Sequence, residues 1–457
     1  MVYTNLRDWL QRLHQDGQLK HISREVNLKH ELAAVGKDAN GKFAVCFDNV
    51  VGENLPGGKS KMPVIVGANG SREMMAKALG LERKEDLARH YYHAQCNPIE
   101  PIVIEKKDAP CKEIIKFKEE INLFEFPAPV HHALDAGQYI DANILVSANP
   151  KTGKRNVSVH RFQIKDKNHL GICIFPKHLN EYFKMSEASN MPLEIAICIG
   201  VDPVLMLASQ AKLAFDEEEY GVAGALYGKA LELVHCETVN LDVPAQSEIV
   251  LEGRILPNIR EMEGPFGEFP RNYGWAEPRQ IVEITAITMR KNPIFVDIVP
   301  ATNDHTLLGA IVNEGIVLNA IKASVSGVKN VVMTPGPSAR YCAVVQIKKQ
   351  KEGEAKNCIC AALGCNEVLK KVIVVDEDVN PYDYEDIDWA TTLRVRPDQD
   401  ILIIPGMKGN RSDPSTDEGY GAKIGIDATV PLDAQSEKNL RITIPNEENI
   451  HVEDYID

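Results

Sequence analysis

Two glutamates that flank a tight turn are the residues of this chain best suited to chemistry. The segment Glu263-Gly-Pro-Phe-Gly-Glu268 places them around glycine and proline, the residues that allow a backbone to turn sharply. Such a turn can direct both acids into one pocket, where the first negative charge opposes the second ionisation and keeps one proton available near neutral pH. The segment therefore predicts an acid/base site. The alternative is a solvated turn between strands with acidic flanks.

A cation that can serve these acids lies earlier, in Asn156-Val-Ser-Val-His160-Arg161. In a strand, Asn156, Ser158 and His160 share one face, and Arg161 points to the other face unless the strand bends. Arg161 can supply the forked guanidinium that binds a substrate carboxylate. It can instead pair with one glutamate and leave the other to carry a proton. A lone arginine in this position is otherwise a surface residue.

Three residues offer nitrogen and oxygen ligands for a divalent cation. Asn156 lies on the strand just described, His178 follows Phe-Pro-Lys, and Glu232 sits in the apolar stretch 230–234. We expect Glu232 to be buried with a partner, because an unpaired buried carboxylate is costly. The set suits Mn²⁺ or Mg²⁺. The three residues are scattered and form no local metal motif, so their spacing alone does not establish a metal site.

Three further segments carry weaker signals. The glycine-rich stretch 419–425 holds Lys423 and can bring backbone N–H groups and a cation to a phosphate, although it has neither Walker nor Rossmann spacing. Residues 376–380 resemble the start of a calcium loop, but Pro381 stands where that loop needs glycine, so we interpret them as a strand-end loop. His305 is expected in a loop at a domain boundary, where it can contact a substrate.

The elements that must position these residues fall into three regions. Residues 1–112 mix helical faces, such as Leu6 to Leu13 and Arg72 to Leu79 after Ser71, with short apolar runs. Residues 113–304 contain many short β-rich segments separated by glycine and proline, which favours a β-barrel or sandwich. Residues 305–457 alternate strands and helices, a pattern typical of a parallel sheet. We therefore predict an α/β multidomain protein with these three domains.

Composition limits the classes of protein to consider. The chain has 457 residues, 44% hydrophobic and 25% charged, as in a soluble globular protein. It has neither a membrane-length apolar run nor the pattern of a signal peptide, so we expect a cytoplasmic protein. Its ten cysteines are then expected to be reduced thiols. The net charge of −14 disfavours nucleic-acid binding and repels anionic substrates at long range, so an acid substrate needs a local cation.

Taken in order, these segments resemble the UbiD family of reversible decarboxylases over nearly the whole chain. The segments that carry the resemblance are Asn156 to Arg161, Pro176-Lys177-His178, 231–234, Ser247 to Gly253, Glu263 to Glu268, Val374 to Val379 and Lys423. The resemblance implies an N-terminal α/β domain, a central split β-barrel like that of flavin reductases, and a C-terminal α/β domain that helps to form homo-oligomers. A homodimer or homohexamer is expected.

The resemblance also implies a cofactor, prenylated FMN, which a separate flavin prenyltransferase supplies. A divalent metal, usually Mn²⁺, holds its phosphate, often together with K⁺. Residue by residue, Asn156, His178 and Glu232 match the family's metal-and-phosphate ligands, Lys423 matches its phosphate-contacting lysine, and Arg161, Glu263 and Glu268 match its Glu-Arg-Glu catalytic set. Lys177 departs from the pattern, because many relatives have glutamine before the metal histidine.

The chemistry that this family performs fits these residues. Loss of CO₂ from an sp² carbon leaves an electron pair that no side chain accepts well, and the modified flavin is the implied electron sink. We expect Arg161, oriented by Glu263, to position the substrate, and Glu268 to deliver the proton that replaces the carboxylate.

The substrate expectation rests on the segment Thr302 to Leu307, which favours aromatic or heteroaromatic acids, including furan dicarboxylates and hydroxybenzoates. One alternative is a carboxylase subunit of a larger complex that works in the reverse direction. Another is a catalytically silent flavin-binding subunit. The presence of Arg161, Glu263 and Glu268 together argues against the silent subunit.

Overall fold

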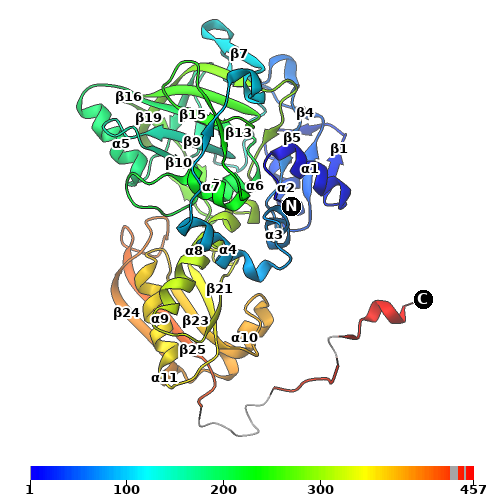
Figure 1. Ribbon diagram of the computed structural model, residues 1–457, viewed down its shortest axis with the longest axis vertical. Helices are drawn as coiled ribbons and strands as arrows, with labels where there is room; N and C mark the ends of the chain where they lie inside the picture. Colours follow the sequence, from blue (N-terminus) through cyan, green and yellow to red (C-terminus); the bar gives the residue numbers. More distant parts are fainter. Residues whose placement is uncertain (1, 433–440, 447–448, 457) are drawn as a thin grey trace. The chain divides into compact units, whose positions relative to one another are not determined.

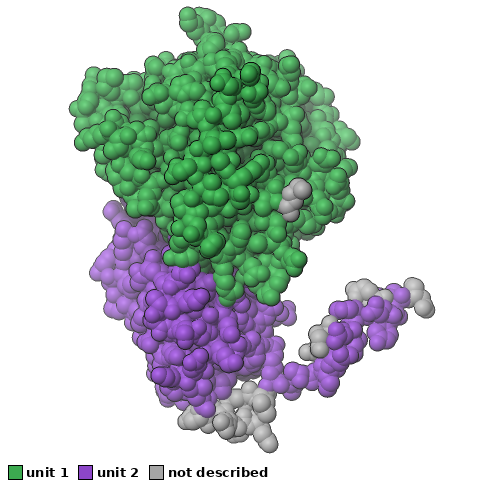
Figure 2. Space-filling view, in the orientation of Figure 1, with its two compact units in different colours: residues 1–315, 335–340, 412–414 green, residues 316–334, 341–411, 415–457 purple. Residues whose placement is uncertain are grey.

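A computed structural model describes residues 2–432, 441–446 and 449–456 of the chain. The chain forms two compact units (Figure 2). Unit 1 comprises residues 1–315, 335–340 and 412–414, and unit 2 comprises residues 316–334, 341–411 and 415–457. None of the helices described has the length and apolar character needed to cross a membrane.

A nine-stranded antiparallel sheet forms the centre of unit 1 (Figure 1). Its strands run in the order β10-β9-β13-β16-β19-β12-β11-β8, and β7 pairs with β19. The inward residues of β13 and β16 are buried aliphatic side chains such as Ile195, Ile197 and Leu251. The β-rich central region that the sequence predicts is therefore confirmed. The strands are β7 (Ile114–Phe117), β8 (Tyr139–Ile140), β9 (Asn143–Ala148), β10 (Arg155–Ser158), β11 (Phe162–Ile164), β12 (His169–Ile172), β13 (Leu193–Ile199), β16 (Ile249–Glu263) and β19 (Glu277–Met289).

The two longest strands, β16 and β19, pair along most of their length and carry the chain to the predicted acid/base turn. Their register shifts between Glu252 and Gly253 and again between Ile255 and Arg260. A Cβ at Gly253 would lie 2.4 Å from the Glu283 carbonyl oxygen, so the first shift requires glycine. Glu263 is the last residue of β16, at the far end of this bent pair.

A four-stranded sheet with helices forms the N-terminal part of unit 1, as the sequence predicts. Its order is β1-β3-β5-β20. In helix α1, Leu6, Trp9, Leu10 and Leu13 are buried on one face, and the Ser71 side chain caps α3 by accepting from the Met74 N–H. The elements are α1 (Leu6–Gln15), β1 (Leu19–Ile22), α2 (Glu31–Ala39), β3 (Ala44–Phe47), β5 (Val64–Val66), α3 (Arg72–Ala78), α4 (Leu87–Cys96) and β20 (Phe295–Val296).

Shorter elements complete unit 1. Strands β6 (Ile102–Val103), β14 (Glu232–His235) and β15 (Asp242–Pro244) form one small sheet. Two further strand pairs are β2 (Val26–Asn27) with β4 (Val50–Val51) and β17 (Phe266–Gly267) with β18 (Tyr273–Gly274). The helices are α5 (His178–Ala188), α6 (Pro203–Ala208) and α7 (Glu219–Tyr227).

Unit 2 is built on a five-stranded sheet of order β21-β22-β23-β25-β24 (Figure 1). Strands β22, β23 and β25 are parallel, as the alternating pattern predicts, whereas the edge strands β21 and β24 are antiparallel to their neighbours. Helices α9 and α10 cover opposite faces, because Ile359 of α9 faces Gly425 while Ile387 of α10 packs with Ile426. The elements are β21 (Val328–Met333), β22 (Cys342–Ile347), α9 (Glu354–Cys365), β23 (Lys371–Asp376), α10 (Tyr384–Leu393), α11 (Pro397–Asp400), β24 (Ile401–Lys408) and β25 (Tyr420–Ala428).

One local prediction is wrong, and one segment has a structure that the sequence did not indicate. The glycine-rich stretch that holds Lys423 lies in strand β25 from residue 420 onward, where residues 424–428 pair with β23 and residues 420–426 pair with β24 across a register shift. His305 was expected in a loop but does not lie in one. It lies in the first turn of helix α8 (Asn303–Lys322).

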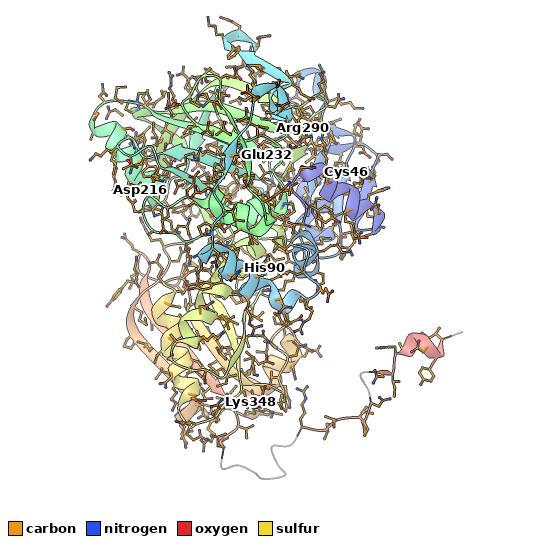
Figure 3. All side chains as sticks on the ribbon, in the orientation of Figure 1. Cys46, His90, Asp216, Glu232, Arg290 and Lys348 are labelled. Atoms are coloured by element: carbon orange, nitrogen blue, oxygen red, sulfur yellow. The ribbon has the colours of Figure 1, made fainter. Side chains whose placement is uncertain are left out.

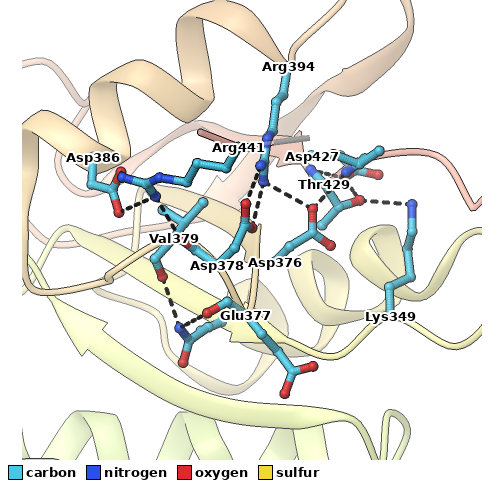
Figure 4. Close-up of polar contacts among 12 residues, drawn as sticks. Lys349, Asp376, Glu377, Asp378, Val379, Asp386, Arg394, Asp427, Thr429 and Arg441 are labelled. Carbon is cyan, nitrogen blue, oxygen red and sulfur yellow. Dashed lines mark hydrogen bonds and ion pairs between the residues drawn. The ribbon is translucent and has the colours of Figure 1, made fainter. Parts of the chain in front are cut away.

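The acidic segment at the end of β23 binds arginines, which supports its interpretation as a strand-end loop. Arg394 contacts Asp376 at 3.2 Å and donates to both oxygens of Asp378, and Arg441 pairs with Asp386 at 2.6 Å (Figure 4). The two guanidiniums lie 4.7 and 5.1 Å from the Trp389 ring centre. These aspartates are thus part of a structural ion-pair network.

Candidate functional site

The structure brings the three predicted catalytic residues into direct contact. Arg161 donates from Nε to Glu263 Oε1 at 3.0 Å and from Nη2 to Glu263 Oε2 at 2.9 Å, a bidentate pair. Its Nη1 donates to Glu268 Oε1. Arg161 therefore holds both glutamates at once, whereas the sequence offered pairing with one glutamate or binding to substrate. A guanidinium has five N–H groups, so two remain for a further acceptor.

Burial sets the electrostatics of this trio. The side chains of Arg161, Glu263 and Glu268 are 11%, 1% and 17% exposed. Burial would lower the pKa of Arg161, but the hydrogen bond to Glu263 and the charge of Glu268 raise it. For Glu268, burial raises the pKa, and the guanidinium opposes this shift only in part. Burial thus shifts Glu268 toward its protonated form.

Two backbone features place these side chains. Strand β10 ends at Ser158 and β11 begins at Phe162, so the chain bends between them. Arg161 lies in this bend, and its side chain therefore does not follow the alternation of faces in a straight strand. Residues 263–268, here called the catalytic turn, run from the last residue of β16 through the short strand β17 to Glu268. Across from it, a Cβ at Gly274 would lie 3.1 Å from Glu268 Oε1 and 3.4 Å from Arg161 Nη1, so glycine lets the backbone approach this closely.

A second loop, residues 132–136, holds the catalytic turn and was not found by sequence reasoning. The Gly267 N–H donates to Asp135 Oδ1 at 2.9 Å, and the His132 N–H donates to Asp135 Oδ2 at 2.8 Å. The Ala136 N–H donates to the Pro265 carbonyl at 2.9 Å. Burial would raise the pKa of Asp135, but its hydrogen bonds lower it. We call residues 132–136 the clamp loop.

Asn156 and His178, two of the predicted metal ligands, also lie together. Asn156 Oδ1 is 3.2 Å from His178 Nδ1, and His178 is the first residue of helix α5. The Asn156 amide donates to Ser158 Oγ, which lies 3.0 Å from His160 Nε2, so these three share a face as predicted. An imidazole and an amide oxygen at a helix N-terminus fit a divalent cation with a phosphate.

The other two predicted cofactor ligands are not joined to this pair. Glu232 is exposed rather than buried, because it starts β14 on the face opposite Leu231 and Leu233. Figure 3 marks its position in unit 1. Its side chain has no hydrogen bond or ion pair within the described part of the chain. In unit 2, Lys423 is buried and donates to the carbonyls of Asn366 and Glu367 at 3.3 and 3.0 Å. Burial lowers the pKa of Lys423.

Glu219 is a buried acid near Asn156 that sequence reasoning missed. It accepts from the Val157 N–H at 2.7 Å, and burial raises its pKa to about 8. Glu219 is the first residue of helix α7, and its neighbour Glu218 pairs with Arg155. An acid at the start of an apolar segment was the signal available, but its partner is a backbone group, which no side-chain pattern reveals.

His305, the predicted substrate contact, lies beside the residue that follows the catalytic turn. Its ring centre is 6.1 Å from that of Phe269, whose ring also lies 5.8 Å from the Arg340 guanidinium. Burial lowers the pKa of His305 to about 4, and the charge of Arg340 acts in the same direction. His305 is therefore a neutral imidazole at pH 7, and its Nδ1 is buried without a partner in the described residues.

The fold and the trio together define a class of protein. It is a mixed α/β protein whose central antiparallel sheet presents a buried arginine between two glutamates, one of them biased toward its protonated form. Three consecutive parts of the chain match the 3-octaprenyl-4-hydroxybenzoate carboxy-lyase domains: residues 10–91 the N-terminal domain, 102–303 the Rift-related domain and 306–428 the C-terminal domain. The chain belongs to the UbiD family of carboxy-lyases.

Relatives of known name extend along nearly the whole chain. Anhydromevalonate phosphate decarboxylase of Methanothermobacter thermautotrophicus is 35% identical over 96% of this chain and 99% of its own length. Phenolic acid decarboxylase of Sedimentibacter hydroxybenzoicus is 34% identical over 94% of this chain and 92% of its own.

A solved structure of the family is similar throughout. The UbiD-class enzyme HmfF from Pelotomaculum thermopropionicum, in complex with FMN, is 44% identical and superposes with a TM-score of 0.95 over 99% of this chain and 100% of that one. An evolved dimeric form of HmfF in complex with prFMN gives 42% identity and a TM-score of 0.90 over the same shares. The α/β multidomain fold that the sequence predicts is confirmed.

Proposed function

We propose that this protein is a prenylated-FMN-dependent decarboxylase that removes CO₂ without oxidation from an aromatic or heteroaromatic carboxylic acid. The observation that carries the proposal is the contact of Arg161 with both Glu263 and Glu268 in a buried site. A cation that already balances two acids, yet keeps two free N–H groups, can hold the substrate carboxylate that the net charge of the protein repels.

The three residues take different roles. Glu263 fixes the guanidinium plane through two parallel hydrogen bonds, so Arg161 presents its remaining N–H groups in one direction. Glu268 is fixed through one oxygen only, and burial favours its protonated form. It can therefore transfer a proton to the carbon that loses CO₂. Arg161 then stabilises the carboxylate that remains on Glu268.

The cofactor proposal rests on Asn156 and His178. Their oxygen and nitrogen atoms lie 3.2 Å apart at the first residue of α5, so these two side chains would hold a divalent ion such as Mn²⁺ or Mg²⁺, which would balance the charge of a phosphate. Glu232, in the same unit, completes the proposed metal set, with K⁺ as a second ion. Lys423 stays a prediction from the sequence alone. HmfF binds FMN and prFMN, and when prenylated FMN is bound it supplies the electron sink that side chains lack.

The substrate class follows from the surroundings of the trio. Phe266 lies under Arg161 at 4.8 Å, and Phe269, the residue after Glu268, lies beside His305, so each of these two polar side chains has an aromatic ring next to it. Neutral His305 can form a hydrogen bond to a ring heteroatom or hydroxyl, and the neighbouring Arg340 charge favours a second acidic group. These features favour furan dicarboxylates and hydroxybenzoates. The relative from Sedimentibacter hydroxybenzoicus is named for phenolic acids.

The partners follow from the same proposal. We infer that a flavin prenyltransferase supplies the cofactor and that the chain forms a homo-oligomer, either a dimer or a hexamer. Light scattering of the cofactor-loaded protein tests the second inference, and a monomer at micromolar concentration contradicts it. The alternative direction, carboxylation within a larger complex, uses the same residues, since Glu268 can equally remove the ring proton.

The test is co-expression with a flavin prenyltransferase, followed by two measurements on one preparation. The intact mass of the released cofactor should be that of prenylated FMN, and a screen of aromatic and furan acids should show CO₂ release from at least one of them. The R161A variant controls for background release. Prenylated FMN without CO₂ release from any acid would contradict the decarboxylase proposal, and absence of flavin would contradict the cofactor site.

A further inference from the structure

A second cluster of ligand-type side chains lies buried in unit 1, apart from Asn156 and His178. It consists of His131, Asp141 between β8 and β9, and Asp297 directly after β20. The side chains of His131 and Asp297 are completely buried, and that of Asp141 is 12% exposed. The proposed reaction uses none of the three.

The polar atoms of this cluster are only partly satisfied. His131 Nε2 forms a 2.9 Å hydrogen bond with Asp297 Oδ2. On the other side of the ring, His131 Nδ1 lies 3.9 Å from Asp141 Oδ2, which is too far for a hydrogen bond. His131 Nδ1, both Asp141 oxygens and Asp297 Oδ1 are buried without a partner among the described residues. Buried polar atoms nearly always have partners, so we expect an ion or a proton to lie between these atoms.

We propose that His131 and Asp141 bind a divalent transition-metal ion such as Mn²⁺ or Zn²⁺, at a site separate from the cofactor. Two ligand atoms that each lie ~2.0–2.2 Å from one ion are up to ~4.4 Å apart, so the 3.9 Å between Nδ1 and Oδ2 is a ligand-to-ligand distance. Asp297 completes the arrangement. Metal-bound histidines usually donate their other ring N–H to a carboxylate, as Nε2 here is placed to do.

Ligand type decides which ion fits. One imidazole nitrogen and a carboxylate suit Mn²⁺ or Zn²⁺ better than Ca²⁺ or K⁺, which prefer oxygen ligands alone. With His131 neutral, the two aspartates carry two negative charges, which a divalent ion balances in a buried setting. A proton can take the place of the metal ion, because His131 can instead become an imidazolium between the two carboxylates.

The ion would lie close to the catalytic turn, on the side of the Phe266 ring. The His131 ring meets the Phe266 ring edge-on at 6.4 Å, and Arg161 lies 4.8 Å from the same ring. A bound ion would therefore help to hold the Phe266 ring in place beneath Arg161. The proposal does not depend on the decarboxylase activity, because its test reads metal content.

The test compares metal content in protein from cells grown with added Mn²⁺ and Zn²⁺, then dialysed against a weak chelator. Mass spectrometry of the metals should find one ion fewer per chain in D141N than in the wild type. H178A should retain the buried ion and lose only the cofactor-site ion. H132Q, which removes the neighbouring histidine, is the matched control and should hold as much metal as the wild type. Equal metal content in D141N and wild type would overturn the proposal.

A second measurement needs no variant, in case D141N fails to fold. Crystals of the wild-type protein grown from the same preparations should show an anomalous-scattering peak, at the absorption edge of manganese or zinc, between His131 Nδ1 and the Asp141 carboxylate. A map with no peak there would refute the site and leave protons as its occupant.

Discussion

Glu268 is the residue whose proton the proposed reaction consumes, and burial keeps that proton available. Burial raises its pKa, with Arg161 opposing. Below the raised pKa Glu268 is protonated and can donate, and above it the proton is lost. We therefore expect kcat for CO₂ release to stay level on the acid side and fall as pH rises through this pKa. A pH profile of kcat under saturating substrate checks this, and a rate that rises over the same range would contradict it.

Asp135 is expected to act as a positioning residue, because it holds the backbone N–H directly before Glu268. In D135N the amide keeps one oxygen but turns an NH₂ toward the other N–H donor, so one of the two hydrogen bonds to Gly267 and His132 is lost. We expect kcat to fall about 10- to 100-fold with little change in KM or bound flavin, because small misplacements of a catalytic group are costly.

The matched control is D166N. Asp166 also accepts two backbone N–H groups, from Asn168 and His169, but in an exposed loop. D166N should retain wild-type kcat. If D135N is as active as D166N, the clamp loop does not position the catalytic turn.

The residue types alone predicted the contact among Arg161, Glu263 and Glu268, but not the residues that hold the surrounding backbone in place. Arg161, Glu263 and Glu268 carry charges that must be balanced when buried, so their meeting could be foreseen. Asp135 and Glu219 bind backbone groups, and such contacts leave no pattern in the sequence. The burial expected for Glu232 was wrong because its apolar neighbours occupy the other face of a strand.

At the scale of elements, the catalytic turn and the clamp loop fit together only because Gly267 has no side chain. A Cβ there would lie 2.3 Å from His132 Nδ1. In G267A either the His132 ring must shift or the two segments must separate, so we expect a loss of about 1–3 kcal/mol in the free energy of unfolding and a marked fall in kcat. Thermal unfolding and CO₂ release measure the two effects.

G364A is the control for this substitution. Gly364 lies in helix α9, and a Cβ added there would have nothing within 4 Å, so alanine should be neutral or slightly stabilising. Unchanged stability and activity in G267A would show that the close packing of the two segments is not required.

Most elements could be predicted from periodicity and caps, and the exceptions have physical reasons. Helix α1 and the Ser71-capped α3 were found because one face is apolar and a capping side chain precedes the helix. The stretch around Lys423 was not predicted as a strand, because glycine is rare in strands. Gly425 nevertheless lies in β25, where a Cβ would lie 2.2 Å from an Ile359 side-chain carbon of the covering helix.

At the scale of the whole molecule, the two units have separate cores, and the Arg394 network stabilises unit 2. Arg394 is 6% exposed and pairs with Asp376 and Asp378 beside Trp389. R394A leaves both aspartates without this partner, so we expect a loss of about 1–3 kcal/mol, smaller than for a fully buried pair because Asp378 is partly exposed. Chemical denaturation should show this loss in the transition of unit 2.

R396A is the matched control, because Arg396 pairs with Asp400 at 3.5 Å with its own side chain 59% exposed. An exposed pair contributes little, so its loss should change stability by less than about 1 kcal/mol. Equal effects of R394A and R396A would mean that the network is no more than a set of surface ion pairs.

Glu268 is proposed to donate the proton in a prenylated-FMN decarboxylase, and the E268Q variant tests this role most directly. Glutamine keeps the size of the side chain and an acceptor for Arg161 but has no acidic proton. Protein co-expressed with a flavin prenyltransferase should hold as much prenylated FMN as the wild type. Its steady-state CO₂ release should fall about 10²- to 10⁴-fold. CO₂ release at the wild-type rate with the cofactor bound would contradict the account.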